Sequence, residues 1–421
     1  MSITLILVAL LAFYVACNLG ANDVANAMGT SVGSKAITLK QAIIIAGILE
    51  FTGAVLFGHE VSATLATKIA NPQLFIATPQ ILLAGMVTVL LSAGLWLQIA
   101  TSRGLPVSSS HAVVGAIAGF TWVALGAGAI NWSSIGLITI GWIFTPIMSG
   151  AIAAVFYSQI KHWILDQPNQ VAQLQEWIPW LSVILLSVFG VIVLPSLTQP
   201  LTNYLNQQLG LNIPAYDIPL FTGALAAVGL TVFSWQKLGN EGEIVPSTQY
   251  PVPIERLFAR FQVLSACFVA FAHGSNDVGN AIAPLAAIVY IHLTGSVPIN
   301  SITIPIWILI LGGAGIVTGL AIWGRKVIAT IGENIISLQP SSGFCAELAT
   351  ATTILLASRL GLPVSTSHAL VGGVVGIGIV QNIKSIKFQT LQGIAAAWII
   401  TVPISALLGA AIFSTARMFF L

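Results

Sequence analysis

Long apolar segments, almost free of charge, follow one another from end to end of this 421-residue chain. Only 14 Lys+Arg and 12 Asp+Glu are present, which is 6% of the residues against about 25% in soluble proteins. So few charges cannot cover a soluble surface, which argues against a soluble enzyme, a nucleic-acid-binding protein and a disordered protein. Backbone polar groups inside a bilayer must bond within the protein, and the alternating pattern of a membrane β-barrel is missing. The sequence therefore predicts an all-α polytopic membrane protein.

About twelve membrane-spanning helices of roughly 20 residues fit the apolar segments. The opening stretch MSITLILVALLAFYVA has neither a positive flank nor a small-residue cleavage site, so we interpret it as the first span. The eighth segment is too long for one plain helix, and we expect a break in it. The predicted spans are residues 3–21, 39–58, 80–100, 105–128, 134–158, 177–198, 217–236, 257–291, 302–323, 341–357, 363–382 and 389–420.

Lysine and arginine residues are divided unequally between the two sides of this topology. With residue 1 outside, three of them lie outside: Lys68, Arg359 and Arg417. Eleven lie inside: Lys35, Lys40, Arg103, Lys161, Lys237, Arg256, Arg260, Arg325, Lys326, Lys384 and Lys387. This positive-inside bias predicts a multi-pass protein of the plasma (inner) membrane, with both termini outside and a cytoplasmic loop at 237–256.

Two motifs occur twice along the chain. Residues 104–119, GLPVSSSHAVVGAIAG, match residues 361–376, GLPVSTSHALVGGVVG, at eleven of sixteen positions. The segment NDVANAM (22–28) matches NDVGNAI (276–282) at five of seven. Because the matches fall in the same order in both halves, the sequence indicates an internal duplication.

The duplication sets the expected architecture. Seven predicted spans separate the two N-D-V-x-N motifs, an odd number, so the halves should have opposite orientations in the membrane. Inverted-topology repeats of this kind, with broken or re-entrant helices at the midplane, are typical of secondary transporters. We divide the chain into a first repeat at 1–160, connecting spans and a central loop at 161–256, and a second repeat at 257–421.

Asp23 and Asp277 occupy equivalent positions in the two halves, each inside apolar sequence. A carboxylate at membrane depth is costly unless it is paired or binds an ion. Carboxylate and amide oxygens suit Na⁺, and a titrating Asp could instead relay protons; hydrogen bonding between helices is the purely structural alternative. We predict cation ligands among Asn22, Asp23, Asn276 and Asp277, and substrate contacts from Asp23, Asn26, Asp277 and Asn280.

The motif G-L-P-V-S-[ST]-S-H predicts a helix start in each half. Pro106 and Pro363 disfavour helix in the residue before them, and the hydroxyls that follow can cap the next turn. A helix N-terminus offers free N–H groups and a partial positive charge, so two such starts could close on one oxyanion, although capping alone is the simpler alternative. The candidate anion ligands are Ser108, Ser109, Ser110, Ser365, Thr366 and Ser367.

Two further pairs of polar residues accompany these motifs. His111 and His368 follow the hydroxyls and could either donate to the anion or bond to a neighbouring helix. Glu50 and Glu347 lie in apolar stretches but break the symmetry of the repeat, because their equivalents in the other half are Ile and Leu. Each of these two acids could be an ion ligand, a proton carrier or a partner for a nearby arginine. We favour a role in ion coupling.

The other acids lie in or near polar connections, and we interpret them as solvated loop charges: Glu60, Asp166, Glu176, Asp217, Glu241, Glu243, Glu255 and Glu333. The cysteines are read as buried reduced thiols: Cys17, Cys267 and Cys345. The chain has no convincing catalytic set, no zinc-protease motif and no ATP-binding motif. We therefore predict no enzyme activity and no cofactor. We expect the energy for transport to come from an ion gradient or from the gradient of the substrate itself.

Together these motifs resemble the inorganic phosphate transporter (PiT) family. The resemblance covers most of the chain and is weakest in 160–250. It is carried by GANDVANAMGTSVGSKAIT (20–38), ILEFTGAVLFG (48–58), GLPVSSSH (104–111), HGSNDVGNAIAPLAA (273–287) and PSSGFCAELATATTILLASRLGLPVSTSHALVGG (340–373).

The resemblance implies a symporter of inorganic phosphate with Na⁺ or H⁺ that works as a homodimer in the lipid bilayer. It also implies that Asp23, Asp277, Glu50 and Glu347 matter for function, and that the two Ser/Thr clusters bind phosphate. The short loop at 237–256 favours a prokaryotic-type transporter, because animal members carry a large insertion there.

The residues constrain the mechanism further. The anion site has no arginine cluster, so bound Na⁺ or protons should neutralise phosphate from close by. We favour Na⁺ because the Asn–Asp motifs supply several hard oxygen ligands. The alternatives are a symporter of another tetrahedral oxyanion such as sulfate and, from a different class, an ion channel or an intramembrane hydrolase, against which the matched motifs argue.

Overall fold

The computed structural model describes residues 3–103, 105, 107–240, 253–299, 302–324, 328 and 335–420. Over these residues the chain is helical almost throughout, and the β-structure amounts to one isolated bridge between Ala70 and Ile130. The predicted all-α fold class is confirmed. Pro106, Arg325, Lys326, Glu241, Glu243 and Glu333, and residues 241–252 of the predicted cytoplasmic loop, lie outside the described residues.

The first half of the chain contains helices α1 to α6. They are α1 (Ile3–Gly33), α2 (Leu39–Phe57), α3 (His59–Thr67), α4 (Pro79–Ser102), α5 (Ser109–Leu125) and α6 (Trp132–Ile160). Three helices connect the halves: α7 (Gln170–Ile192), α8 (Leu194–Gln208) and α9 (Asp217–Asn240). The second half contains α10 (Pro253–Thr294), α11 (Ile306–Ile322), α13 (Pro340–Arg359), α14 (Thr366–Asn382) and α15 (Phe388–Phe420).

These helices have the length and composition of membrane spans. Among the described residues, nine are long and apolar enough to cross a bilayer, and α5 and α11 are apolar but shorter, at 17 residues each. Each predicted span overlaps a helix, so a multi-pass membrane protein is confirmed, while the number of crossings stays a prediction. One boundary is wrong: the span predicted at 177–198 is α7, which ends at Ile192, and α8 starts afresh with a proline in its first turn.

The predicted break in the eighth segment is also wrong. The helix α10 runs unbroken for 42 residues, and at about 1.5 Å per residue it is longer than a bilayer core of about 30 Å. Asn276 and Asp277 lie within this helix, and their side chains bond to Ser358 and Thr366. Helix α4 packs on α5, and α13 packs on α14.

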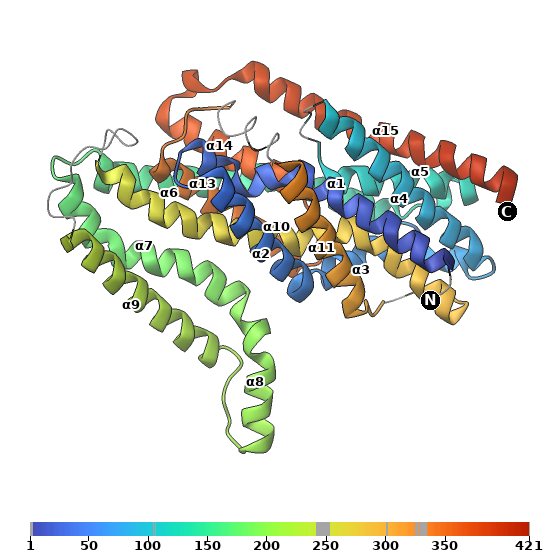
Figure 1. The fold of residues 1–421 in the computed structure, drawn as a ribbon, viewed down its shortest axis with the longest axis horizontal. Helices are drawn as coiled ribbons and strands as arrows, with labels where there is room; N and C mark the ends of the chain where they lie inside the picture. The colour runs from blue at the N-terminus through green and yellow to red at the C-terminus, as the bar shows by residue number, and fades with distance from the viewer. Residues whose placement is uncertain are drawn as a thin grey trace.

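The helices of the two halves follow a matching order along the chain. Helices α1, α2, α4, α5 and α6 follow the same order as α10, α11, α13, α14 and α15, and equivalent pairs pack together, such as α5 on α15 and α14 on α6. Figure 1 shows these helices forming an elongated body, from which α8 and the adjoining ends of α7 and α9 project. Opposite orientation of the halves in the membrane, and the three-part division of the chain, stay predictions.

Helices α1 and α10 form the centre of the body. In an apolar 18-residue stretch of α10, 72% of the residues are buried, against 17% in the corresponding stretch of α9. Glycines let the backbones approach: a Cβ on Gly274 of α10 would lie 2.1 Å from the Glu50 carbonyl oxygen on α2, and one on Gly20 of α1 would lie 2.0 Å from that of Ile316 on α11. This close approach brings the Glu50 side chain against α10.

Candidate functional site

The two predicted helix starts exist and meet. Ser108 and Ser365 are the N-caps of α5 and α14, and their hydroxyl oxygens accept from the backbone N–H of His111 (3.4 Å) and His368 (3.3 Å). The Ser110 hydroxyl donates to the carbonyl of Val364 across the junction, at 3.2 Å. Two buried helix N-termini, each with its free N–H groups, therefore lie side by side.

The N-D-V-x-N motifs lie in the middle of α1 and α10, opposite these starts. The Asn280 amide donates to the Ser109 hydroxyl at 3.1 Å, and the Asn26 amide donates to the Thr366 hydroxyl at 3.5 Å. Each motif thus faces the helix start of the other half. Thr366 also donates to Asp277 Oδ2 at 2.9 Å, so hydroxyls, amides and carboxylates from both halves are gathered in one place.

A histidine that the sequence analysis did not single out joins the carboxylates. His273 Nε2 lies 3.0 Å from Asp277 Oδ2, and its Nδ1 lies 3.2 Å from Glu50 Oε1; all three side chains are buried. Both contacts are within ion-pair distance, but neither ring nitrogen of His273 makes a hydrogen bond within the described residues. The signal in the sequence was the spacing H-x-x-x-D, which places His273 and Asp277 one helical turn apart.

Asp23 completes this cluster and could share a cation with it. One ligand atom each from Asp23, His273 and Asp277 lie within 4.8 Å of one another. The Asn26 amide donates to Asp23 Oδ1 at 3.1 Å, whereas Asp23 Oδ2 makes no hydrogen bond within the described residues although it is buried. A buried carboxylate oxygen without a donor is costly, and the two Glu50 oxygens of the same cluster also lack one, so a cation here would be stabilised.

Asn22 and Asn276 lie to the two sides of the carboxylates. The Asn22 amide donates to the Thr101 hydroxyl at 2.8 Å. The Asn276 amide satisfies its neighbours best with its oxygen towards the Ser358 hydroxyl and its nitrogen towards Asp277 Oδ1, each at 3.1 Å. Ser358 borders a pocket of about 180 Å³, whose rim carries Arg359. The chain Ser358–Asn276–Asp277 therefore connects the wall of a pocket to a buried carboxylate.

Comparisons with known proteins match phosphate transporters over most of the chain. Residues 19–409 match the Phosphate transporter family. The chain is 40% identical over 415 residues to "Inorganic phosphate transporter 2-1, chloroplastic" of Arabidopsis thaliana, covering 95% of this chain and 70% of that one. It is also similar to a solved structure, "The sodium-dependent phosphate transporter", with a TM-score of 0.87, 36% identity and 99% coverage of both chains. This chain belongs to the phosphate transporter family. The family is one of transporters and not of enzymes, as the sequence predicted.

A second buried cluster of this transporter surrounds Glu347. The hydroxyls of Thr30 and Ser31 both donate to Glu347 Oε1 at 2.6 Å, and the Gln262 amide donates to the same oxygen at 3.1 Å. The Ser265 hydroxyl donates to Oε2 at 2.7 Å. The sequence analysis identified Glu347 but missed these four donors, because Ser, Thr and Gln on apolar helices are common and only the fold brings them together.

The two predicted acids therefore have different surroundings. Glu50 shares His273 with Asp277, while Glu347 is held by neutral donors contributed by α1 and α10. An arginine partner was one of the alternatives considered from the sequence. The described contacts of Glu50 and Glu347 include no arginine. The guanidinium of Arg359 donates instead to the Ser196 hydroxyl.

The transporter's two repeated histidines form a matched pair. His111 Nδ1 contacts the Trp398 carbonyl at 3.2 Å, and His368 Nδ1 contacts the Trp142 carbonyl at 2.9 Å. A carbonyl only accepts, so each Nδ1 carries its proton, and neither buried Nε2 has a partner within the described residues. The Nδ1 contacts fit the neighbouring-helix interpretation; donation to the anion stays a prediction.

Glu255 requires a correction. We interpreted it as a solvated loop charge, but it lies in the first turn of α10 and is only 4% exposed. Its carboxylate accepts from the backbone N–H of Ser341 at 2.8 Å and from the Ser341 hydroxyl at 2.7 Å. Glu255 thus serves the free N–H groups at the start of α13, and its burial follows from this tertiary contact.

Proposed function

We propose that this protein is a secondary active transporter that couples the entry of inorganic phosphate to Na⁺. The observation that carries the proposal is the meeting of two helix starts from the two halves, opposite the buried cluster of Asp23, Asp277 and His273. The helix starts favour an anion and the carboxylates favour a cation, so the two can bind as neighbours. The family and the sodium-dependent structural relative support the same pairing.

In this proposal the phosphate ligands come from both halves. The helix starts contribute N–H groups and hydroxyls, and the amides of Asn26 and Asn280 already contact those hydroxyls. Asp23 and Asp277 would accept from a protonated phosphate oxygen and would also hold the cation. The proposed ligands are Asp23, Asn26, Ser108, Ser109, Ser110, Asp277, Asn280, Ser365, Thr366 and Ser367.

The charges at the site favour an order of binding. The site gathers three carboxyl groups, those of Asp23, Asp277 and Glu50, around one histidine, His273. No Lys or Arg is buried among the described residues. An anion that entered first would be repelled, so Na⁺ binds before or together with phosphate. Asn22, Asn276 and Glu347 would serve the cation rather than the anion.

The decisive experiment is uptake by the purified protein in proteoliposomes. An imposed inward Na⁺ gradient should drive saturable phosphate accumulation, and a proton gradient of equal size without Na⁺ should drive much less. Accumulation that follows the proton gradient alone would overturn Na⁺ coupling and favour H⁺. A phosphate affinity that is unchanged when all Na⁺ is removed at constant pH would contradict the neighbouring cation.

Selectivity is tested in the same vesicles. Sulfate is fully ionised near neutral pH, whereas phosphate keeps a hydroxyl that can donate to Asp23 or Asp277. Excess sulfate should therefore leave labelled phosphate uptake nearly unchanged, and strong competition would favour a general oxyanion symporter. Uptake that never exceeds the equilibrium concentration would indicate a channel.

The proposal places the protein in the plasma membrane as a homodimer with both termini outside. Orientation follows from the uneven distribution of Lys and Arg, and the pocket beside Ser358 and Arg359 then faces outside. A cysteine placed near either terminus should react with a membrane-impermeant reagent on intact cells. Reaction only after the cells are opened would reverse the orientation.

A further inference from the structure

The pocket of about 180 Å³ beside Ser358, here named the Arg359 pocket, has both exposed and buried residues in its wall. Arg359 is exposed, whereas Ser275 and Ser358 are at most 5% exposed, and the hydroxyl oxygens of the two serines lie 3.5 Å apart. Ser358 also bonds to Asn276 of the second N-D-V-x-N motif. The Arg359 pocket can hold several waters or one small hydrated ion, and its wall adjoins the proposed transport site.

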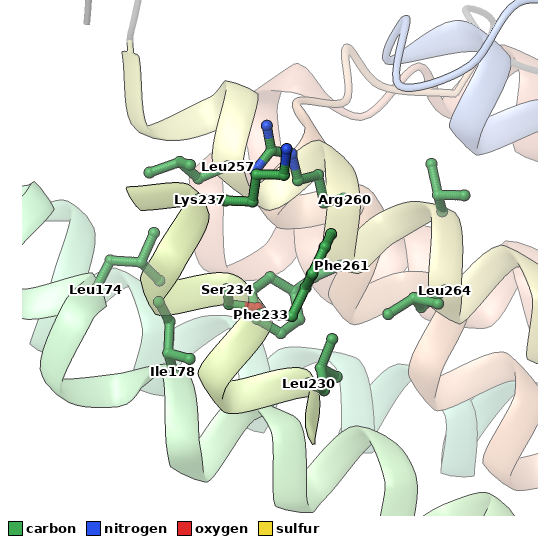
Figure 2. A pocket seen from close by; sticks show the side chains of 11 residues that line it. Leu174, Ile178, Leu230, Phe233, Ser234, Lys237, Leu257, Arg260, Phe261 and Leu264 are labelled. Atoms are coloured by element: carbon green, nitrogen blue, oxygen red, sulfur yellow. The ribbon is translucent and has the colours of Figure 1, made fainter. Parts of the chain in front are cut away.

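A larger cavity, of about 440 Å³, lies between α7, α9 and the start of α10. Figure 2 shows apolar side chains such as Leu174, Ile178 and Leu230 around it. None of the described residues that line this cavity is a proposed transport residue. The Arg359 pocket, by contrast, shares Ser358 with the contacts that end at Asp277, so it is the candidate entrance.

The positive charge in the wall of the Arg359 pocket comes from Arg359, in the last turn of α13, and no other Lys or Arg lines it within the described part of the chain. The guanidinium donates to the hydroxyl of Ser196 on α8, which also lines the pocket, so the charge is held at the wall. A guanidinium carries five N–H donors in a planar fork, and a phosphate can accept from them alongside the bond to Ser196. The wall can therefore bind an inorganic oxyanion directly.

Glu60 lines the same pocket and opposes Arg359. Its side chain is 70% accessible, and its Oε1 lies 3.9 Å from Nδ1 of His59. A carboxylate so exposed is screened by water and salt, and it can turn away from the pocket. Arg359 can instead make a charge-assisted hydrogen bond to the anion, which is stronger than an interaction across water. The two charges thus act on phosphate in opposite directions, and Arg359 has the stronger effect.

We propose that the Arg359 pocket binds inorganic phosphate on its way to the helix starts, with the Arg359 guanidinium as its ligand. The inference rests on the proposed transport of phosphate and adds a residue outside the repeat, because the first half has Ser102 at the equivalent position. No Lys or Arg is buried among the described residues, so a phosphate that has passed this pocket meets no further buried Lys or Arg there. A cation at the entrance raises the local phosphate concentration and speeds entry.

The first test measures the electrostatic potential of the Arg359 pocket at a single cysteine. In the full-length protein without its native cysteines, Ser358→Cys is labelled with an anionic or a cationic impermeant thiol reagent of similar size. Arg359→Gln should lower the ratio of the anionic to the cationic rate about ten-fold, as expected for a unit charge about 6 Å away in a water-like medium. Glu60→Gln should raise the same ratio. An unchanged ratio in Arg359→Gln, or no labelling by either reagent, would overturn the proposal.

Three variants separate charge from structure. Arg359→Lys keeps the charge and should keep the ratio within about two-fold. Lys68→Gln removes an exposed cation that does not line the pocket and should leave the ratio unchanged. Ser196→Ala removes the bond between α8 and α13 but keeps the guanidinium, so most of the charge effect should persist. A loss in Ser196→Ala as large as that in Arg359→Gln would give Arg359 a purely structural role and contradict the proposal.

The second test uses phosphate itself. In intact cells at low ionic strength, Arg359→Gln should raise the phosphate concentration for half-maximal uptake about five-fold, and the difference should shrink at high salt with Na⁺ held constant. The Na⁺ concentration for half-maximal uptake should stay as in the wild type. An equal phosphate value for the wild type and Arg359→Gln at low salt would overturn the inference. A wild type without phosphate uptake would instead contradict the proposed function, with the labelling ratio unaffected.

Discussion

Asp23 and Asp277 are equivalent in sequence but have different partners. Asp277 Oδ2 accepts from Thr366 and faces His273, and Oδ1 can accept from Asn276. Asp23 has one amide donor on Oδ1 and none on Oδ2 within the described residues. The position of His273 in the other half is Leu19, and that of Glu50 is Ile316. The repeat thus supplies two carboxylates, of which Asp277 has donors for both oxygens and Asp23 for one.

The largest effect is expected where this asymmetry is removed. His273→Leu introduces the residue of the first half and leaves Glu50 buried without its charged partner, which should cost about 3–5 kcal/mol of stability. Adding Glu50→Ile makes the second half resemble the first, and should recover most of that loss. Thermal unfolding of the purified protein in detergent measures both.

The double variant is the control for the single one, because it removes the same imidazole. If the double variant is no more stable than His273→Leu alone, the histidine does not stabilise the fold through Glu50. A loss confined to His273→Leu in the presence of Na⁺, and absent without it, would also contradict the explanation, since the pair exists before a cation binds.

The second prediction compares the two aspartates directly. Asp23→Asn removes the carboxylate oxygen that is free to hold a cation, so Na⁺ affinity should fall about 100-fold or more, at the upper end of what lost metal partners cost. Asp277→Asn weakens a carboxylate that already has donors, and the fall should be nearer about 10-fold. Na⁺-dependent thermal stabilisation without phosphate measures both affinities.

Glu60→Gln is the matched control, because Glu60 is an exposed acid with a side chain 70% accessible. Its Na⁺ affinity should equal that of the wild type. Equal losses in the Asp23 and Asp277 variants would show that the two carboxylates share the cation evenly and that their different partners have no effect on Na⁺ binding.

The third prediction concerns Glu347, which has no acidic counterpart in the first half. Its two carboxyl oxygens accept four hydrogen bonds, and Gln would replace one of these acceptors by a donor. Glu347→Gln should raise the Na⁺ concentration for half-maximal uptake about 10-fold. The phosphate concentration for half-maximal uptake at saturating Na⁺ should stay as in the wild type, because none of the helix-start hydroxyls contacts Glu347. A shift in the phosphate value alone would place Glu347 at the anion instead.

The repeat explains why part of this site could be predicted from the sequence. Duplicated motifs such as G-L-P-V-S-[ST]-S-H can be recognised without knowledge of the fold. Both helix starts that they predict lie where they were expected. His273 and Gln262 occur once, so the repeat gave no signal for them. Their partners, Glu50 and Glu347, are 223 and 85 residues away and meet them only through helix packing.

The fold shows the same limit. The length of the apolar segments predicted the helices. It could not distinguish a polar stretch that separates two helices from a polar stretch within one continuous helix. The helix α10 therefore continues through the long eighth segment, in which we expected a break, and α7 ends earlier than its apolar run suggested. Glu255 was misplaced for a related reason: a charge near a loop looks solvated until a helix start is packed against it.

The smallest effect distinguishes the two sides of the carboxylate cluster. Thr101 and Ser358 are equivalent, and each bonds to the asparagine before a repeated aspartate. Replacing either by Ala removes one neutral hydrogen bond, so each should cost about 1 kcal/mol of stability. Only Ser358 also borders the pocket beside Arg359, so only Ser358→Ala should change the phosphate concentration for half-maximal uptake, by about two-fold. In a background without the native cysteines, Ser358→Cys should react with an impermeant thiol reagent and be protected by Na⁺ with phosphate. Thr101 is half-buried and has the equivalent position in the other half, so Thr101→Cys should not react from the same side. Equal labelling of the two would remove the distinction between the two sides of the site.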